Sequence, residues 1–283
     1  MKTIKTSIVI ICLTIIISII IPACLGKVTG PDRNFVYPLK VGNYWEYDFS
    51  YEHFDSETGE PSLLRPNIYT TSTAEIIGMD TLGDTLETFV FYTEDDTANA
   101  NSFNSATVYL NNNPDGFYQY ANNGVSLIAP AKPSKTNHCY TYIGISFKSV
   151  DQLFDFFSPK LYSSSSDNLR RGLAYPFKIG NQWTVVTLGD ANPFQRIVKR
   201  ITNWTKVKTE AGEFDCFKIQ WLWDFDGDGL WDDNLVGYDY VSEHGLIVRE
   251  LRINGTIITD YTGQPIDTCD IVQKFELKKL DLK

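Results

Sequence analysis

Alternating apolar and polar residues dominate the chain from residue 36 onward. Short runs rich in β-branched and aromatic residues are separated by Gly, Asn and Asp, which is typical of antiparallel strands joined by tight turns. The runs are 73–77, 86–92, 106–110 and 116–120, followed by 196–201, 205–209, 214–223, 235–241 and 246–253. This pattern predicts a mostly β fold made of antiparallel meanders.

Helical periodicity is confined to one short segment. In Val150–Phe157 four apolar residues, Val150, Leu153, Phe154 and Phe157, fall at positions i, i+3, i+4 and i+7, so one face of a helix would be apolar. The segment lies between the two groups of strands. We therefore expect a single short helix in the segment that connects them.

Two copies of a nine-residue motif open the two groups of strands. The copies are Tyr37–Trp45 (YPLKVGNYW) and Tyr175–Trp183 (YPFKIGNQW), which share six of nine residues at a spacing of 138. Proline suits the first residue of a strand, Gly-Asn permits a tight bend, and Trp45 and Trp183 would then fill the core. The motif predicts two related halves.

The motif and the strand groups divide the chain into six parts. These are a signal peptide (1–23), a tether (24–35), a first meander half (36–128), a connecting segment with the short helix (129–173), a second meander half (174–262) and a C-terminal tail or strand (263–283). We expect the halves to bury their apolar faces together, packed as a sandwich or an open barrel.

The amino terminus has the zones of a lipoprotein signal peptide. Two lysines precede an apolar run of 14 residues, 8–21, which is shorter than the roughly 20 residues that a membrane-spanning helix needs. Residues 21–24 (IPAC) resemble the lipobox of bacterial lipoproteins, so cleavage after residue 23 would leave Cys24 as the lipidated residue. Its acyl chains would anchor the mature chain to a membrane.

The residues after Cys24 indicate to which membrane a lipoprotein would be sorted. They are Leu25 and Gly26, with no aspartate at the next position. By resemblance to enterobacterial sorting rules, this favours an outer-membrane lipoprotein of the bacterial cell envelope, facing the periplasm or the surface.

Charge and composition exclude one class of partner. The chain has 25 Lys+Arg and 35 Asp+Glu, a net charge of −10, and removal of residues 1–23 with their two lysines changes this to 23 − 35 = −12. Nucleic-acid binding needs clustered Lys and Arg, so nucleic acid is not an expected partner. The 17 Phe, 16 Tyr and 6 Trp favour a large folded core instead.

The number of cysteines is odd for the oxidising compartment that the signal peptide implies, and it does not specify a disulfide pairing. If Cys24 is lipidated, Cys139, Cys216 and Cys269 remain in the mature chain. One disulfide and one buried free thiol is the simplest expectation, and all three pairs stay open.

An acidic loop at 224–233 has the spacing of a calcium-binding loop. Ca²⁺ takes about six to eight oxygen ligands, and a D-x-D-x-D-G sequence supplies alternating carboxylates before a glycine that allows a sharp turn. The candidate ligands are Asp224, Asp226 and Asp228, the carbonyl of Leu230, and Asp232 and Asp233. Strand-like runs flank the loop, so we expect calcium to stiffen the tip of a β-hairpin; a solvated acidic turn without an ion is the alternative.

Three segments together resemble a family of uncharacterised bacterial envelope lipoproteins. The segments are the motif at 37–45, the sequence AGEFDCFKI at 211–219 and the sequence VSEHGLIVR at 241–249. The resemblance covers most of residues 36–252. It implies an envelope β-domain without an assigned enzymatic activity, and it assigns no catalytic residues.

Catalytic motifs are absent from the sequence. His53, His138 and His244 lie in separate segments and have no zinc-binding spacing. His138-Cys139 would point to opposite faces of a strand, and a carboxylate pair such as Glu46 and Asp48 is more often a solvated face. We therefore expect a protein that is not an enzyme.

Two functions are consistent with these observations. The first is a non-catalytic, lipid-anchored envelope protein that is structural or binds a protein or a hydrophobic ligand between its β halves. The second is a calcium-dependent carbohydrate-binding module, in which exposed Tyr and Trp would stack on a glycan. An interior arrangement of the aromatic side chains would favour the first, and an exposed coplanar row of them the second.

Overall fold

The computed structural model describes residues 34–63, 65, 67–82, 86–96, 104–124, 139–142, 144–157, 170–188, 195–260 and 262–283. These all belong to one compact unit, residues 32–283. The expected signal peptide, Cys24 and His138 lie outside the described residues. Within the described part, no helix is long and apolar enough to cross a membrane.

The described chain is almost entirely antiparallel β-structure with one short helix, α2 (Val150–Phe157). The strands are β1 (Tyr44–Asp55), β2 (Ile68–Leu82), β3 (Leu86–Asp96), β4 (Asn104–Asn113), β5 (Gly116–Gly124), β6 (Cys139–Tyr142), β7 (Ile145–Phe147), β8 (Arg170–Ala174), β9 (Gln182–Leu188), β10 (Gln195–Thr209), β11 (Gly212–Asp224), β12 (Leu235–Ser242), β13 (Gly245–Thr259) and β14 (Pro265–Asp281). The predicted β class and the predicted helix are both confirmed.

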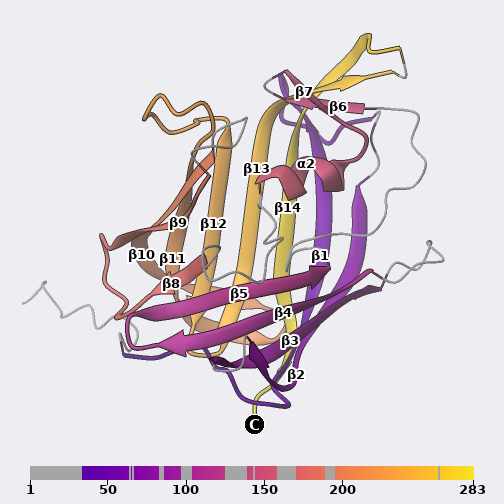
Figure 1. Ribbon diagram of the computed structural model, residues 1–283. Helices are drawn as coiled ribbons and strands as arrows, with labels where there is room; N and C mark the ends of the chain where they lie inside the picture. The colour runs from indigo at the N-terminus through magenta and orange to yellow at the C-terminus, as the bar shows by residue number, and fades with distance from the viewer. Residues whose placement is uncertain are drawn as a thin grey trace, which may run out of the picture. The chain divides into compact units, whose positions relative to one another are not determined.

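All strands belong to one sheet, in which the two meanders join edge to edge. Twelve strands follow the order β8-β5-β4-β3-β2-β1-β14-β13-β12-β11-β10-β9, and β6 and β7 extend it from β13. Figure 1 shows the C-terminal strand β14 between β13 and the N-terminal strand β1. The meander halves therefore share a sheet through the β1–β14 pair and are not stacked as two sheets.

The two ends of the strand path approach each other. Seven residues, 175–181, separate the end of β8 from the start of β9. The indole Nε1 of Trp183 on β9 donates a hydrogen bond of 3.0 Å to the carbonyl of Arg171 on β8. The sheet is thus nearly closed, which corresponds to the open-barrel form of the prediction.

The core lies on the inner face of this sheet. On β1 alternate side chains are buried, and Phe49 on that strand packs on Phe275 of β14 with ring centroids 4.5 Å apart. Helix α2 turns its apolar face to the same core, where Phe154 lies 5.2 Å from the ring of Tyr51. This alternation is the physical basis of the hydrophobic pattern in the sequence.

The two motif copies form the same turn. Gly42 and Gly180 have φ angles of 86° and 89°, a left-handed conformation that a side chain strains. Each turn is held by equivalent bonds: Gly42 N to Ile76 O (2.8 Å) and Gly180 N to Ile201 O (2.7 Å), Asn43 Nδ2 to Pro38 O (2.8 Å) and Asn181 Nδ2 to Pro176 O (3.2 Å). The local geometry of the motif is therefore repeated where each meander begins.

The first residues of the two motif copies also meet. The hydroxyl of Tyr175 accepts a hydrogen bond from the backbone N–H of Tyr37 (2.7 Å) and donates one to Asn112 Oδ1 (2.8 Å). Asn112 Nδ2 in turn donates to the carbonyl of Tyr37 (2.7 Å). This triangle ties the entry to the first half to the entry to the second.

Candidate functional site: an interior cavity and an acidic loop

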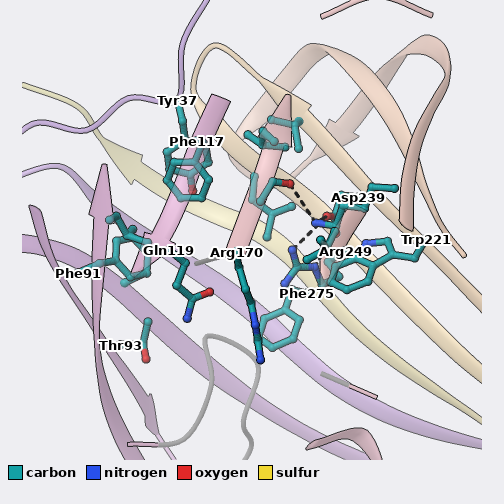
Figure 2. Close-up of a pocket in the computed structure, with 18 of the residues that line it drawn as sticks. Tyr37, Phe91, Thr93, Phe117, Gln119, Arg170, Trp221, Asp239, Arg249 and Phe275 are labelled. Carbon is teal, nitrogen blue, oxygen red and sulfur yellow. Dashed lines mark hydrogen bonds and ion pairs between the residues drawn. The ribbon is translucent and has the colours of Figure 1, made fainter. Parts of the chain in front are cut away.

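A cavity of about 140 Å³ lies inside the sheet, between the two halves. Every strand of the twelve-strand path contributes to its wall. Its lining residues are Tyr37, Tyr47, Ser72, Ala74, Phe91, Thr93, Leu110, Phe117 and Gln119 from the first half, and Arg170, Gly172, Leu173, Val185, Ile197, Lys199, Trp221, Asp239, Val241, Leu246, Arg249 and Phe275 from the rest of the chain. Figure 2 shows most of these side chains.

Strand alternation and one glycine shape the wall. Residues two apart on one strand face the cavity together, as Phe91 and Thr93 do on β3. Gly172 on β8 lies against Phe117, and a Cβ atom at Gly172 would be 2.8 Å from the Cδ1 atom of that ring. Glycine at this position therefore leaves room for the Phe117 ring against β8 in the cavity wall.

A buried ion cluster forms one side of the cavity. Asp239 on β12 accepts hydrogen bonds from Lys199 Nζ (2.8 Å) and from Arg249 Nε (2.5 Å) and Nη2 (3.1 Å). The Asp239 side chain is 1% exposed and that of Lys199 is 5% exposed. Lys199 Nζ also lies 3.9 Å from the ring centroid of Trp221. Figure 2 shows Asp239 and Arg249 joined beside Trp221.

Burial and charge oppose each other in this cluster. Burial alone would raise the pKa of Asp239, but the charges of Arg249 and Lys199 outweigh it and lower the pKa to about 2. Burial lowers the pKa of Lys199 to about 8 against the opposing charge of Asp239. At neutral pH the cluster therefore holds two cations and one anion.

Arg170 is a third cation in the cavity wall, and it stands apart from this cluster. It is 9% exposed, its Nε atom is buried without a hydrogen-bond partner, and no ion pair to it occurs among the described residues. Burial lowers its pKa to about 10, with no carboxylate acting against that effect. On β8 it lies opposite Gln119 of β5, another lining residue.

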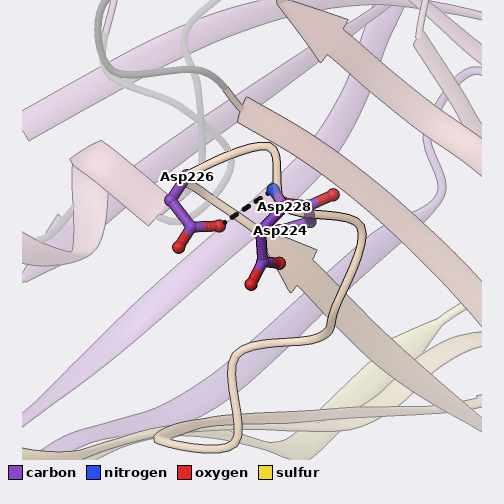
Figure 3. Close-up of side chains that lie close together, drawn as sticks. All are labelled: Asp224, Asp226 and Asp228. Atoms are coloured by element: carbon purple, nitrogen blue, oxygen red, sulfur yellow. Dashed lines mark hydrogen bonds between the residues drawn. The ribbon is translucent and has the colours of Figure 1, made fainter.

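The acidic loop connects β11 to β12 at the tip of a hairpin, as predicted. Carboxylate oxygens of Asp224, Asp226 and Asp228 lie within 4.8 Å of one another, and Figure 3 shows the three side chains close together. Each also accepts a backbone N–H bond within the loop: Gly227 N to Asp224 (2.8 Å), Asp228 N to Asp226 (3.1 Å) and Leu230 N to Asp228 (2.7 Å). The local sequence folds so that three of the candidate ligands converge.

The remaining candidate ligands lie in the same loop but outside this group of three. Asp232 Oδ2 accepts a bond from Phe225 N (3.0 Å), and its pKa is raised, first by burial and then by the charges of the neighbouring aspartates. Leu230 and Asp233 belong to the loop between the strands and are not part of the close carboxylate group. Clustered oxygen donors fit a hard cation such as Ca²⁺.

The three described cysteines are free thiols. Cys216 and Cys269 are buried, and Cys139 is partly exposed. The expected disulfide is not formed between any pair of them. Burial raises the pKa of both Cys216 and Cys269 to about 12, so these two behave as small core residues.

The carboxylate pair on β1 belongs to a salt-bridged outer face. Lys278 Nζ lies 3.1 Å from Asp48 Oδ1 and 3.9 Å from Glu46 Oε1. Among the described aromatic side chains, Tyr69 is the one that is largely exposed, at 68%. Glu46 and Asp48 are therefore ion-paired with Lys278, and the described residues have no row of largely exposed aromatic side chains.

Comparison with known proteins finds no assigned family. No family model matches the chain, and no curated protein matches it. Two crystal structures are similar in part: a candidate lipoprotein from Parabacteroides distasonis (13% identity, 87% of this chain and 98% of that one, TM-score 0.33) and a candidate exported protein with a YmcC-like fold from Bacteroides fragilis (11% identity, 87% and 99%, TM-score 0.35). Both TM-scores are below 0.5, so neither neighbour's role is transferred to this chain.

Proposed function

We propose that this chain is a lipid-anchored, non-catalytic binding protein of the bacterial envelope that takes a small hydrophobic ligand between its β halves. The observation that carries the proposal is the interior cavity of about 140 Å³, to which all twelve strands of the main path contribute. An apolar cavity of about 150 Å³ is enough to bind benzene. A ligand with one aromatic ring or a short branched chain therefore matches the space.

Filling the cavity tests this proposal. Ala74 on β2 lines the cavity and is 5% exposed, so Ala74→Leu adds three carbon atoms to the space. Met79→Leu on the same strand is the control, because Met79 is 56% exposed and outside the lining. Binding of benzyl alcohol to the full chain, followed by ligand-observed NMR, should be lost in Ala74→Leu and kept in Met79→Leu. Equal binding by both variants would contradict the proposal.

The lipid anchor is proposed from the sequence at residues 21–24. Acylation of Cys24 would hold the binding domain at the outer membrane, on its periplasmic or surface side. Metabolic labelling with a fatty-acid analogue should mark the wild type and Cys139→Ser but not Cys24→Ser. Label that persists on Cys24→Ser would remove the anchor from the proposal.

We also propose that Ca²⁺ binds the acidic loop and stiffens its hairpin. Support comes from the convergence of Asp224, Asp226 and Asp228, because a dication would relieve the repulsion among their carboxylates. Asp224 is 2% exposed, so its charge is costly without a cation nearby. Affinity in the range of about 10⁻⁴ to 10⁻³ M, typical of extracellular calcium modules, is expected.

Thermal unfolding with and without calcium tests this site. The wild type should melt several degrees higher in millimolar Ca²⁺ than in EDTA, since an ion that binds only the folded state stabilises it. Asp226→Ala should lose this difference. Glu57→Ala, which removes one exposed negative charge outside the loop, should keep it. A calcium-dependent rise in melting temperature in Asp226→Ala equal to that of the wild type would contradict the calcium proposal.

A further inference from the structure

The cavity wall carries positive charge although the chain as a whole is acidic. Three of its lining side chains are cationic, Arg170, Lys199 and Arg249, and one is anionic, Asp239. The wall therefore has a net charge of +2 inside a chain whose net charge is −10. Composition alone would favour the opposite sign.

Two of these cations are already satisfied by the protein. Both carboxylate oxygens of Asp239 are used, Oδ1 by Arg249 and Oδ2 by Lys199 and Arg249. Lys199 Nζ has a further contact of 3.4 Å with the carbonyl of Gly172. This cluster needs no ligand to complete its hydrogen bonds.

Arg170 differs because nothing in the described part of the chain balances it. A buried guanidinium without a partner costs folding free energy, since burial removes its hydration and no carboxylate replaces it. Its five N–H donors form a planar fork that matches the two oxygens of a carboxylate. The neutral side chain of Gln119 lies opposite it in the cavity wall, so no protein carboxylate competes there.

We propose that the ligand is a small apolar monocarboxylate, whose carboxylate pairs with Arg170 and whose ring or short chain occupies the apolar part of the cavity. This rests on the proposed hydrophobic-ligand function and specifies its chemistry. A single unpaired cation selects one negative charge. The apolar part is supplied by side chains such as Phe91, Leu110 and Phe117.

Paired probes and neighbouring arginines test the proposal. Benzoate and benzyl alcohol have the same ring, but only benzoate is charged at pH 7. Arg170→Gln removes the cavity cation. Arg171→Gln is the matched control, because it makes the same change at the next residue, which lies outside the lining and pairs with Asp115.

Titration calorimetry of the full chain should show tighter binding of benzoate than of benzyl alcohol. Arg170→Gln should lower the affinity for benzoate by about tenfold or more, which is the loss typical of a charge-assisted hydrogen bond. The affinity of this variant for benzyl alcohol should change by less than about threefold. Arg171→Gln should bind both as the wild type does. The melting temperature of unliganded Arg170→Gln should not fall, since no described bond is lost, which shows that the variant folds.

Two results would overturn the proposal, and they distinguish a wrong ligand specificity from a wrong proposed function. If benzyl alcohol binds as tightly as benzoate and Arg170→Gln leaves both unchanged, the carboxylate specificity is wrong while hydrophobic-ligand binding stands. If neither probe binds the wild type, both the specificity and the proposed function fail.

Discussion

One group of charged residues at inward positions is held together by its own ion pairs. Asp239 is the centre of this group, with Lys199 and Arg249 as its partners and the Trp221 ring against them. Removal of one member of a buried ion group typically costs about 3–5 kcal/mol, because the other charges are left unpaired. The group therefore links β10, β12 and β13 in one register.

Burial of one residue, His53 on β1, makes the stability of the folded protein depend on pH. It is 2% exposed and neither ring nitrogen has a hydrogen-bond partner. Burial, and then the positive charge of Arg65, lower its pKa from 6.5 to about 4. The unfolded chain thus takes up a proton below pH 6.5 that the folded chain refuses until about pH 4. Neutral His53 thus favours the folded state above pH 6.5. The free energy of unfolding falls by up to about 3 kcal/mol as the pH drops from about 6.5 to about 4.

Urea unfolding at pH 7.5 and pH 4.5 measures this contribution. His53→Leu should lose much less unfolding free energy between the two pH values than the wild type loses. His244→Leu is the control, because the His244 side chain is 40% exposed. A pH dependence in His53→Leu equal to that of the wild type would show that other groups cause it.

At the scale of elements, the hydrophobic pattern predicts whether a segment is a helix or a strand better than it predicts the length of that element. The pattern predicts the helix Val150–Phe157 at its observed bounds, because four of its five apolar residues follow helical periodicity within the segment itself. Runs 196–201 and 205–209 were predicted as two strands and form one strand, β10, with a register shift between Ile201 and Asn203. A bulge of this kind interrupts the alternation in sequence without ending the strand.

Strand β14 shows the limit of alternation as a signal. The inward residue Gln273 is polar yet 0% exposed, and its Nε2 donates to the hydroxyl of Tyr51 (2.9 Å). That partner lies 222 residues away in sequence. A buried polar residue whose partner is this distant breaks the apolar pattern, so residues 263–283 were predicted only as a tail or a strand.

The repeated turn predicts a conformational cost at Gly180. Its φ of 89° is left-handed and no atom lies within 4 Å of a Cβ built there, so a substitution there tests backbone strain alone. Gly180→Ala should lower the free energy of unfolding by about 1–2 kcal/mol, and Gly180→Asn by less, because Asn tolerates this conformation. Gly78→Ala on β2, with open space and no positive φ, should cost little. Equal losses in Gly180→Ala and Gly78→Ala, measured by urea unfolding, would contradict this.

At the scale of the whole molecule, the two candidate sites differ in how far the sequence predicts them. The acidic loop is local, so the spacing of Asp224, Asp226 and Asp228 was enough to bring their carboxylates together. The cavity is not local, because its wall needs twelve strands in register. Arg170 and Asp239 were not singled out in the sequence. The sequence feature that could have pointed to the cavity wall is a charged residue at an inward strand position, such as Lys199 two residues after buried Ile197.

The shared sheet predicts that the two halves unfold together. Strand β14 pairs with β1 from Tyr44 to Asp55 and with β13 on its other side, and the cavity wall draws on both halves. Ile76 on β2 and Ile219 on β11 are both fully buried. Ile76→Ala and Ile219→Ala should each lower the free energy of unfolding by about 2–5 kcal/mol.

Hydrogen exchange measured by mass spectrometry should then show faster global exchange in residues 44–124 and in residues 195–281 for either variant. Ile77→Ala is the matched control, since Ile77 is next in sequence to Ile76 and is 52% exposed; it should leave exchange in both regions close to that of the wild type. If Ile76→Ala instead accelerates exchange only in residues 44–124, the β1–β14 pair does not couple the halves. They would then be two cooperative units that share a sheet.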